Sequence, residues 1–281
     1  MEQYDLVIAY RVYPGVSKSP PIYSDDKLKL TELCLKSFAR ALQGFRVFIK
    51  VFLDGCPKTY NALFAKTLNG YDFEFEELDC LGNLETFQLQ LEYLSNQKKS
   101  EYVFFAEDDY FYLKNSFSCM LEAIKLRDID FITPYNHPDV HNHSLHSYKK
   151  SEFMLGGIKW IESASTTLTF LTSVNILKET NEVFGSYLGG NNDASIWFTL
   201  TKKPIFDVLN FRFKKLDRLI IKVWMKKYFH NLVVSIFGKK YTLIQPSLSL
   251  ATHMESSLLP PEVDWNKEFN LLIPKNDATN N

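Results

Sequence analysis

An apolar run near the middle of the chain ends abruptly in three acids. Residues Tyr102–Ala106 are aromatic, β-branched or small, and Glu107, Asp108 and Asp109 follow directly. Such a run is typical of a strand buried on both faces, and three adjacent carboxylates repel one another unless a cation lies close by. Carboxylate oxygens suit Mg²⁺ and Mn²⁺, and the carboxyl edge of an open α/β sheet is where ligands bind. The sequence therefore predicts a hard divalent cation at this strand end, holding a diphosphate.

The first 110 residues alternate between strand patterns and helix patterns. Strands are predicted where apolar residues run together or alternate, and helices where they recur at helical spacing. Strands that alternate with helices indicate a mostly parallel sheet covered on both faces, so the predicted fold class is α/β. We expect strands over Asp5–Tyr10, Arg46–Leu53, Phe73–Leu78 and Tyr102–Ala106, and helices over Asp26–Gln43, Thr59–Leu68 and Leu84–Asn96.

The second half has a less regular pattern. Pro134–Ser151 is predicted to be a long polar loop, and Phe153–Ile161 and Thr166–Leu171 are predicted to be strands. Further helices are expected over Asn115–Arg127, Asn191–Lys202 and Arg212–Phe229, and short strands over Phe131–Thr133 and near Thr242–Gln245, which precedes Leu248–His253.

Cysteine usage and charge exclude several classes of protein. Cys34, Cys56, Cys80 and Cys119 show no CxxC spacing, so we expect neither a zinc framework nor a disulfide scaffold, and a reducing cytosol fits best. The first residues are acidic and run straight into a strand, which is unlike a signal peptide. No apolar run approaches the roughly 18 residues of a spanning helix. A net charge of −1 argues against a nucleic-acid partner. The protein is therefore expected to be cytoplasmic.

A basic segment stands apart from this nearly neutral chain. Residues 202–240 contain eleven Lys or Arg and two acids, a net of +9. Lys214, Arg218, Lys222 and Lys226 recur every four residues and would form one stripe of a helix. A basic stripe beside apolar residues that include Trp224 is typical of an interfacial membrane helix. The alternative is a helix packed on its own domain with a solvated basic face. We predict contact between residues 212–240 and an anionic membrane, which would place the protein peripherally on the inner face.

Several segments, in order along the chain, resemble parts of the GT-A glycosyltransferases. Val7-Ile8-Ala9-Tyr10-Arg11 resembles the first strand, and Asp54 resembles the end of the second strand, where this fold contacts the base. Gly82-Asn83-Leu84-Glu85-Thr86 resembles the turn before the metal strand, and Glu107-Asp108-Asp109 resembles the metal motif usually written D-x-D. Asn192-Asp193 resembles the acidic pair of inverting family-2 enzymes, and Ala251-Thr252-His253 resembles a segment with a late histidine.

This resemblance implies a role for particular residues. Asp109 and His253 would bind Mn²⁺ or Mg²⁺. Asp193 would be the base that deprotonates the acceptor hydroxyl in an inverting enzyme, although an Asp at a helix start is also a favoured N-cap and would have another role in a retaining enzyme. Glu107 or Asp108 would hold a metal-bound water or the ribose. The residues expected to bind the nucleotide-sugar are Ala9, Arg11, Asp54, Asn83, Thr86, Glu107 and Asp108.

Candidate acceptor-binding residues lie in the second half. Four histidines occur at positions 137, 141, 143 and 146, but Pro134 and Pro138 interrupt helical spacing there. We therefore expect a loop in which His137 contacts a sugar, in preference to a zinc site. Trp160 could stack on a sugar ring and Thr166 could bond to its hydroxyls, although a strand with one buried Trp explains the same residues.

These inferences combine into a metal-dependent hexosyltransferase with a nucleotide diphosphate sugar as donor and a glycan or lipid-linked acceptor, acting with inversion in polysaccharide biosynthesis. Residues 1–204 would form the GT-A core, divided into a nucleotide-sugar half (1–112) and an acceptor half (113–204). Residues 205–240 would be a basic amphipathic insertion, and 241–281 would return to the metal site.

Two other functions remain open. A sugar-phosphate nucleotidyltransferase would normally have a Gly-rich phosphate loop with a basic residue, which Tyr10–Gly15 matches poorly. A non-catalytic peripheral membrane adaptor would bind lipid but would show no metal-dependent affinity for nucleotides.

Overall fold

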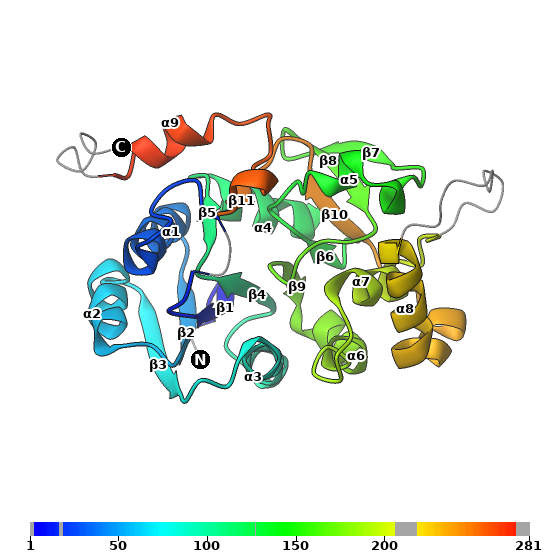
Figure 1. Ribbon diagram of the computed structural model, residues 1–281, viewed down its shortest axis with the longest axis horizontal. Coiled ribbons are helices and arrows are strands. Elements are labelled where there is room, and N and C mark those ends of the chain that lie inside the picture. The colour runs from blue at the N-terminus through cyan, green and yellow to red at the C-terminus, as the bar shows by residue number, and fades with distance from the viewer. Residues whose placement is uncertain (1–2, 17–18, 127, 206–217, 274–281) are drawn as a thin grey trace.

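The computed structural model describes residues 3–16, 19–126, 128–205 and 218–273. Within these ranges a nine-stranded sheet runs through the molecule in the order β3-β2-β1-β4-β9-β6-β10-β8-β7, and helices pack against it (Figure 1). The predicted α/β fold class is confirmed. The strands are β1 Leu6–Val12, β2 Val47–Asp54, β3 Asp72–Leu78, β4 Tyr102–Glu107, β5 Tyr110–Tyr112, β6 Phe131–Ile132, β7 Glu152–Leu155, β8 Ile158–Ser163, β9 Leu171–Ser173, β10 Leu243–Pro246 and β11 Ala251–His253.

The helices alternate with the strands in the first half and cluster in the second. They are α1 Lys27–Ala41, α2 Lys58–Thr67, α3 Asn83–Asn96, α4 Ser116–Leu126, α5 Asp139–Asn142, α6 Val174–Gly185, α7 Asp193–Thr201, α8 Arg218–Phe237 and α9 Trp265–Asn270. Short 3₁₀ turns occur at Ser144–His146 and Ser256–Leu258.

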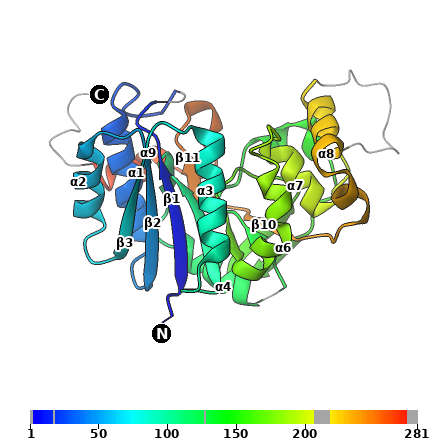
Figure 2. The ribbon, with the colours of Figure 1, turned by 90° about the horizontal axis from the view of Figure 1, so that it is seen from below.

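Strands β1 to β4 are parallel to one another, and β1, β2 and β4 are buried on both faces. Because side chains alternate along a strand, Ile8 and Tyr10 of β1 join the cluster that contains Phe38 of α1, while Val7 and Ala9 join the cluster that contains Phe87 of α3. Figure 2 shows α1 and α2 on one side of β1–β3 and α3 on the other. Two-sided burial explains why β1, β2 and β4 are nearly continuous apolar runs, whereas the edge strand β3 alternates apolar and acidic residues.

The second half of the sheet is mixed, and three predictions there are wrong. The single strand predicted over 153–161 is the hairpin β7–β8, because Gly156 and Gly157 take positive φ values of 56° and 73° and reverse the chain. Of the strand predicted over 166–171, only Leu171 is in a strand, because β9 begins at that residue and pairs antiparallel with β4. The predicted loop over 134–151 contains α5 and a 3₁₀ turn.

The C-terminal segment returns to the first half. Strand β11 pairs antiparallel with β5, and His253 lies opposite Tyr110 in this pair. Since β5 follows β4 after only two residues, the pairing brings His253 next to the acidic end of β4.

Helix α8 lies at the far end of the molecule from α1 and α2 (Figures 1 and 2). Its buried Val223 joins a small cluster with Phe198 of α7 and Ile205. Lys214, the first member of the predicted basic stripe, lies outside the described residues, whereas Arg218 and Lys222 are exposed and Lys226 is half-buried. Among the described helices, none has both the length and the apolar character needed to cross a membrane.

Candidate functional site

A cavity of about 590 Å³ opens at the carboxyl ends of β1, β2 and β4. Nine residues predicted from the sequence line it, and they come from segments between residues 11 and 253. The predicted residues in the lining are Arg11, Asp54, Asn83, Thr86, Glu107, Asp108, Asp109, Asp193 and His253. The remaining lining residues are Val12, Tyr13, Gly15, Lys27, Gly82, Tyr110, Thr167, Leu168 and Tyr187.

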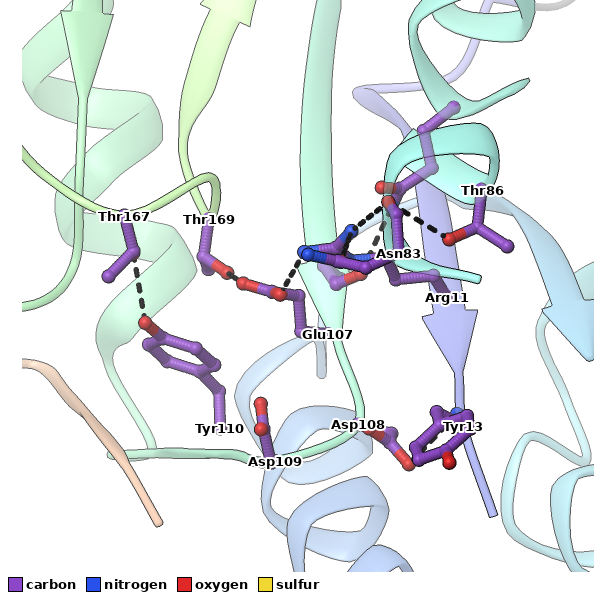
Figure 3. A network of polar contacts seen from close by, with 12 residues as sticks. Arg11, Tyr13, Asn83, Thr86, Glu107, Asp108, Asp109, Tyr110, Thr167 and Thr169 are labelled. Atoms are coloured by element: carbon purple, nitrogen blue, oxygen red, sulfur yellow. Dashed lines mark hydrogen bonds and ion pairs between the residues drawn. The ribbon is translucent and has the colours of Figure 1, made fainter. Parts of the chain in front are cut away.

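Glu107, at the end of β4, forms an ion pair with Arg11 at the end of β1 (Figure 3). Its second oxygen accepts a hydrogen bond of 2.7 Å from Thr169 Oγ1. Burial disfavours the charge on Arg11, but Glu107 more than offsets this effect and the pKa of Arg11 is raised. Arg11 also donates to the backbone oxygen of Asn83 at 3.2 Å and to its side chain. These contacts fix the Arg11 guanidinium between β4 and α3.

Asp108 is held by Lys27, the first residue of α1. The Lys27 Nζ lies 2.9 Å from Asp108 Oδ2, and both side chains are more than nine-tenths buried. Thr31 Oγ1 and the Tyr13 backbone amide also approach this carboxylate, at 3.3 and 3.4 Å. Burial would lower the pKa of Lys27, but Asp108 and then Asp109 reverse that effect, and the pKa lies above its ordinary value. Lys27 is therefore a charged ammonium at neutral pH.

Asp109 faces His253, with 3.1 Å between Oδ2 and Nε2. Burial would raise the pKa of Asp109, but His253, followed by Lys27 and Arg11, lowers it well below the ordinary range. The carboxylate is therefore ionised at neutral pH. Its other oxygen, Oδ1, is buried and has no hydrogen-bond partner among the described residues.

Each of the three acids thus has a cationic or ionisable partner within the protein. Repulsion among Glu107, Asp108 and Asp109 is relieved by these partners, so the acidic run does not by itself require a metal, contrary to the argument from the sequence. The described residues contain no group of three or more His, Cys, Asp or Glu side chains suited to a metal ion. A divalent cation would find two protein ligands at Asp109 and His253, and these fit Mg²⁺ or Mn²⁺, which usually take the rest of their ligands from water and phosphate.

Asp54 organises the turn that opens α3. Its two oxygens accept hydrogen bonds from the backbone amides of Leu81 and Gly82, at 2.7 and 2.8 Å. Gly82 has a φ of +94°, a region that glycine enters without strain, and its carbonyl oxygen accepts from Thr86 Oγ1 at 2.7 Å. Asp54 therefore sets the shape of the cavity wall at Gly82 and Asn83.

Asp193 is the first residue of α7 and reaches the cavity from the second half of the chain. The N-cap is its neighbour Asn192, whose side chain accepts from the Ser195 amide at 2.8 Å. Asp193 Oδ1 accepts from the Ala194 amide, also at 2.8 Å. The capping function that could have explained Asp193 is thus performed by Asn192.

Four predicted residues are not among the described residues that line the cavity. Ala9 is buried in β1, and its carbonyl oxygen accepts from Gln90 Nε2 at 2.8 Å. Trp160 is fully buried and donates to the Leu155 carbonyl. Thr166 is buried and bonds to Thr133, and His137 Nδ1 accepts from the Asp139 amide.

The sequence reasoning missed Lys27, Tyr110 and Tyr187, whereas Thr167 belongs to the Ser165-Thr166-Thr167 run in which hydroxyl contacts to a sugar were expected. Tyr110 donates to Thr167 at 2.9 Å, and Asn83 donates to Tyr187 at 2.8 Å, so each pair joins the two halves of the chain across the cavity. Lys27 offered one local signal, because a basic residue at the start of a helix opposes the helix dipole. The two tyrosines carry no such signal.

The cavity lining is acidic as a whole. Five carboxylates face two Lys or Arg side chains among the described lining residues, a net of −3 with His253 neutral. The fold and this cavity define an α/β protein with an acidic ligand pocket at the carboxyl ends of its parallel strands.

No protein-family model and no curated protein matches the chain. Among solved structures, S. aureus TarS 1-349 in complex with UDP is similar with a TM-score of 0.46 at 16% identity, over 71% of this chain and 54% of that one. The mannosyltransferase PcManGT from Pyrobaculum calidifontis, in complex with GDP-Man and Mn²⁺, gives 0.42 at 11% identity, over 69% and 51%. The chain thus spans about half the length of these two structures.

The inositol-1-phosphate CTP transferase from T. maritima is also similar, with a TM-score of 0.42 at 14% identity over 94% of both chains. The matched structures therefore include a mannosyltransferase and a CTP transferase. All of these similarities are similarities of fold.

Proposed function

We propose that this protein is a metal-dependent glycosyltransferase that moves a hexosyl group from a nucleotide diphosphate sugar to an acceptor hydroxyl. The acidic cavity is the observation that carries the proposal. A lining with a net of −3 repels a diphosphate, so a polyanionic ligand would enter together with a divalent cation. The buried Asp109 Oδ1, which lacks a hydrogen-bond partner among the described residues, is an available ligand for that cation.

Asp109 and His253 would hold Mn²⁺ or Mg²⁺. When bound, this cation would neutralise the charge that develops on the departing nucleoside diphosphate. Arg11 lies on the same wall and is positioned by Glu107 and Asn83 to approach a phosphate oxygen. Thr86 and the turn held by Asp54 would complete the donor side.

Asp193 would act as the general base. It faces the cavity from α7 while the donor-side residues come from β1, β4 and α3. A carboxylate supplied by the second half of the chain is suited to accept the proton of an acceptor hydroxyl as that oxygen attacks the anomeric carbon. Attack from the side opposite the leaving group inverts the configuration, so we propose an inverting reaction.

The proposal includes partners and location. We propose a glycan or lipid-linked acceptor, a role in polysaccharide biosynthesis, and a cytoplasmic enzyme held peripherally at the inner face of a membrane. We also propose the division into a core (1–204), a basic insertion (205–240) and a C-terminal segment (241–281) that returns to the metal site, which is supported by the pairing of β11 with β5.

Calorimetric titration of UDP, GDP, dTDP and CDP, each with and without Mn²⁺, tests the function. We expect one nucleotide to bind only with Mn²⁺ present, and the Asp109→Asn variant to lose that binding. Asp72→Asn is the matched control, because Asp72 lies on the edge strand β3, where it accepts from the Tyr4 hydroxyl.

Other outcomes point elsewhere. Release of pyrophosphate from a nucleoside triphosphate and a sugar phosphate would identify a nucleotidyltransferase. Absence of any metal-dependent nucleotide binding would contradict the enzyme and favour an adaptor.

A further inference from the structure

Helix α8 carries an apolar face that is open to solvent. Phe229, before a kink at Asn231, and Val233 and Phe237, after it, are 84%, 70% and 83% exposed. Met225, Leu232 and Ile236, also on α8, are between 52% and 59% exposed. We call these six residues the apolar face of α8. So many exposed apolar side chains on one element mark a surface that is covered by a partner.

This face is distinct from the one that packs on the protein. Val223 is fully buried, and Ile220 packs beside it against the cluster that includes Phe198 of α7. The helix is also kinked at Asn231, where φ is −135° and ψ is 42°. Asn231 is buried and donates to Ser186 Oγ at 3.2 Å, so the kink is fixed to the α6–α7 connection. Helix α8 is therefore anchored while its apolar face remains outside.

The charged residues in and directly after α8 have one sign. From residue 218 to residue 240 the sequence contains six Lys or Arg and no Asp or Glu. Arg218 and Lys222 are exposed in the first turns of the helix, on the N-terminal side of the apolar face. A basic end followed by an exposed apolar face complements a surface that is anionic outside and apolar beneath.

We propose that the apolar face of α8 inserts into the interface of an anionic lipid bilayer, with Arg218 and Lys222 against the lipid phosphates. A second copy of the chain fits less well, since residues 218–240 contain no acid that could pair with the basic residues of the other copy. This inference rests on the proposed peripheral location, and α8 is the surface that would contact the membrane.

A bilayer bound at α8 would also lie near the α6–α7 connection, which contributes residues to the cavity. Lys226 donates to the carbonyl oxygen of Gly190, and Asn231 holds Ser186. Tyr187, between these two contacts, lines the cavity, and Asp193 follows a few residues later. A bilayer seated on α8 therefore lies beside the connection that carries the acceptor side of the cavity, which favours a lipid-linked acceptor hydroxyl.

Vesicle co-sedimentation of the full chain tests this surface. The wild type is expected to bind vesicles of phosphatidylcholine mixed with phosphatidylglycerol, and to bind pure phosphatidylcholine at least tenfold less. The double variant Phe229→Ser/Phe237→Ser should lose at least tenfold in affinity for the mixed vesicles, while Leu271→Ser, an exposed leucine (61%) after α9, should not. Lys222→Glu should weaken binding to the mixed vesicles by about tenfold or more, and Lys66→Glu on α2 should not.

Two results would overturn the inference. One is unchanged vesicle binding in the double variant. The other is a dimer in sedimentation velocity that the double variant converts to monomer, which would assign the face to a second copy. Nucleotide titration of the same variants separates this inference from the proposed function, because the double variant should bind nucleotide like the wild type. A protein that binds vesicles but no nucleotide would contradict the function and leave the surface intact.

Discussion

At the scale of single residues, the acidic end of β4 is a set of three separate pairs. Glu107 pairs with Arg11, Asp108 with Lys27, and Asp109 with His253. The pairs differ in whether a carboxylate oxygen remains available to a ligand. Among the three acids, only Asp109 keeps a buried oxygen that has no hydrogen-bond partner among the described residues. Adjacent carboxylates can therefore have different roles: Glu107 orients Arg11, Asp108 holds α1 against β4, and Asp109 faces the ligand.

Replacement of Lys27 tests the second of these roles. Lys27→Met leaves the buried Asp108 carboxylate without its cation, and we expect a loss of about 3–5 kcal/mol in the free energy of unfolding, measured by urea denaturation. The double variant Lys27→Met/Asp108→Leu removes both charges and should recover most of that loss. A single variant that costs under about 1 kcal/mol would show that the pair contributes little.

Replacement of Asp193 tests the base. Asp193→Asn keeps the size of the side chain but cannot accept the proton, so kcat should fall by about 10²–10⁴-fold. The Kd for the donor nucleotide should change little, because the proposed role of Asp193 is to bind the acceptor proton and not the nucleotide. Glu182→Gln, an exposed acid on α6, is the control. An unchanged kcat would remove Asp193 from the mechanism.

At the scale of elements, the cavity wall depends on how helices begin. Helix α3 begins at a glycine-containing turn that has no side-chain cap of its own, and the Asp54 carboxylate on β2 supplies the acceptors for that turn. Helix α7 begins with Asn192 as its cap, which leaves the next residue, Asp193, at the cavity. In both cases a polar side chain that bonds to the backbone at the helix start fixes the position of a neighbouring residue in the cavity lining.

The Asp54 contacts lead to a prediction about α3. Asp54→Ala removes the acceptors for two backbone amides, and we expect a loss of about 1–3 kcal/mol in stability together with weaker nucleotide binding. Asp79→Ala, an exposed acid in the same connection, is the matched control. Retention of wild-type affinity in Asp54→Ala would mean that the turn keeps its shape unaided.

At the scale of the whole molecule, burial couples stability to pH. His146 is 8% exposed and packs near Tyr148 and Phe198, and burial, reinforced by Lys150, lowers its pKa to about 3. The unfolded chain binds this proton near pH 6.5. Because the unfolded state binds more protons between these values, stability should fall as pH decreases from about 6.5 toward 3, by about 2 kcal/mol at pH 5.

Urea denaturation at pH 7 and pH 5 measures this effect. His146→Gln has no proton to gain, so its stability should change less across the same interval. An equal change in the variant and the wild type would assign the pH dependence to other groups.

The sequence predicted the parallel half of the fold because its signals are local. Val103–Ala106 is buried on both faces and therefore apolar throughout, and the helices between the strands keep helical spacing. The β7–β8 hairpin was missed because Gly156 and Gly157 lie inside an otherwise strand-like run. Most of the site was anticipated through family resemblance, since no local pattern places His253 beside Asp109. Lys27 and Tyr187 could not be predicted, because their roles arise only from contacts with distant parts of the chain.

The return of β11 to β5 also has a consequence for biosynthesis. A ribosome makes the chain from residue 1 onward, so the parallel strands and the acidic end of β4 emerge long before His253 does. Until then Asp109 lacks its imidazole partner and β5 lacks its neighbouring strand. The nascent protein can assemble its parallel strands β1–β4 early, yet the pocket is completed only when almost the whole of the described chain has been translated.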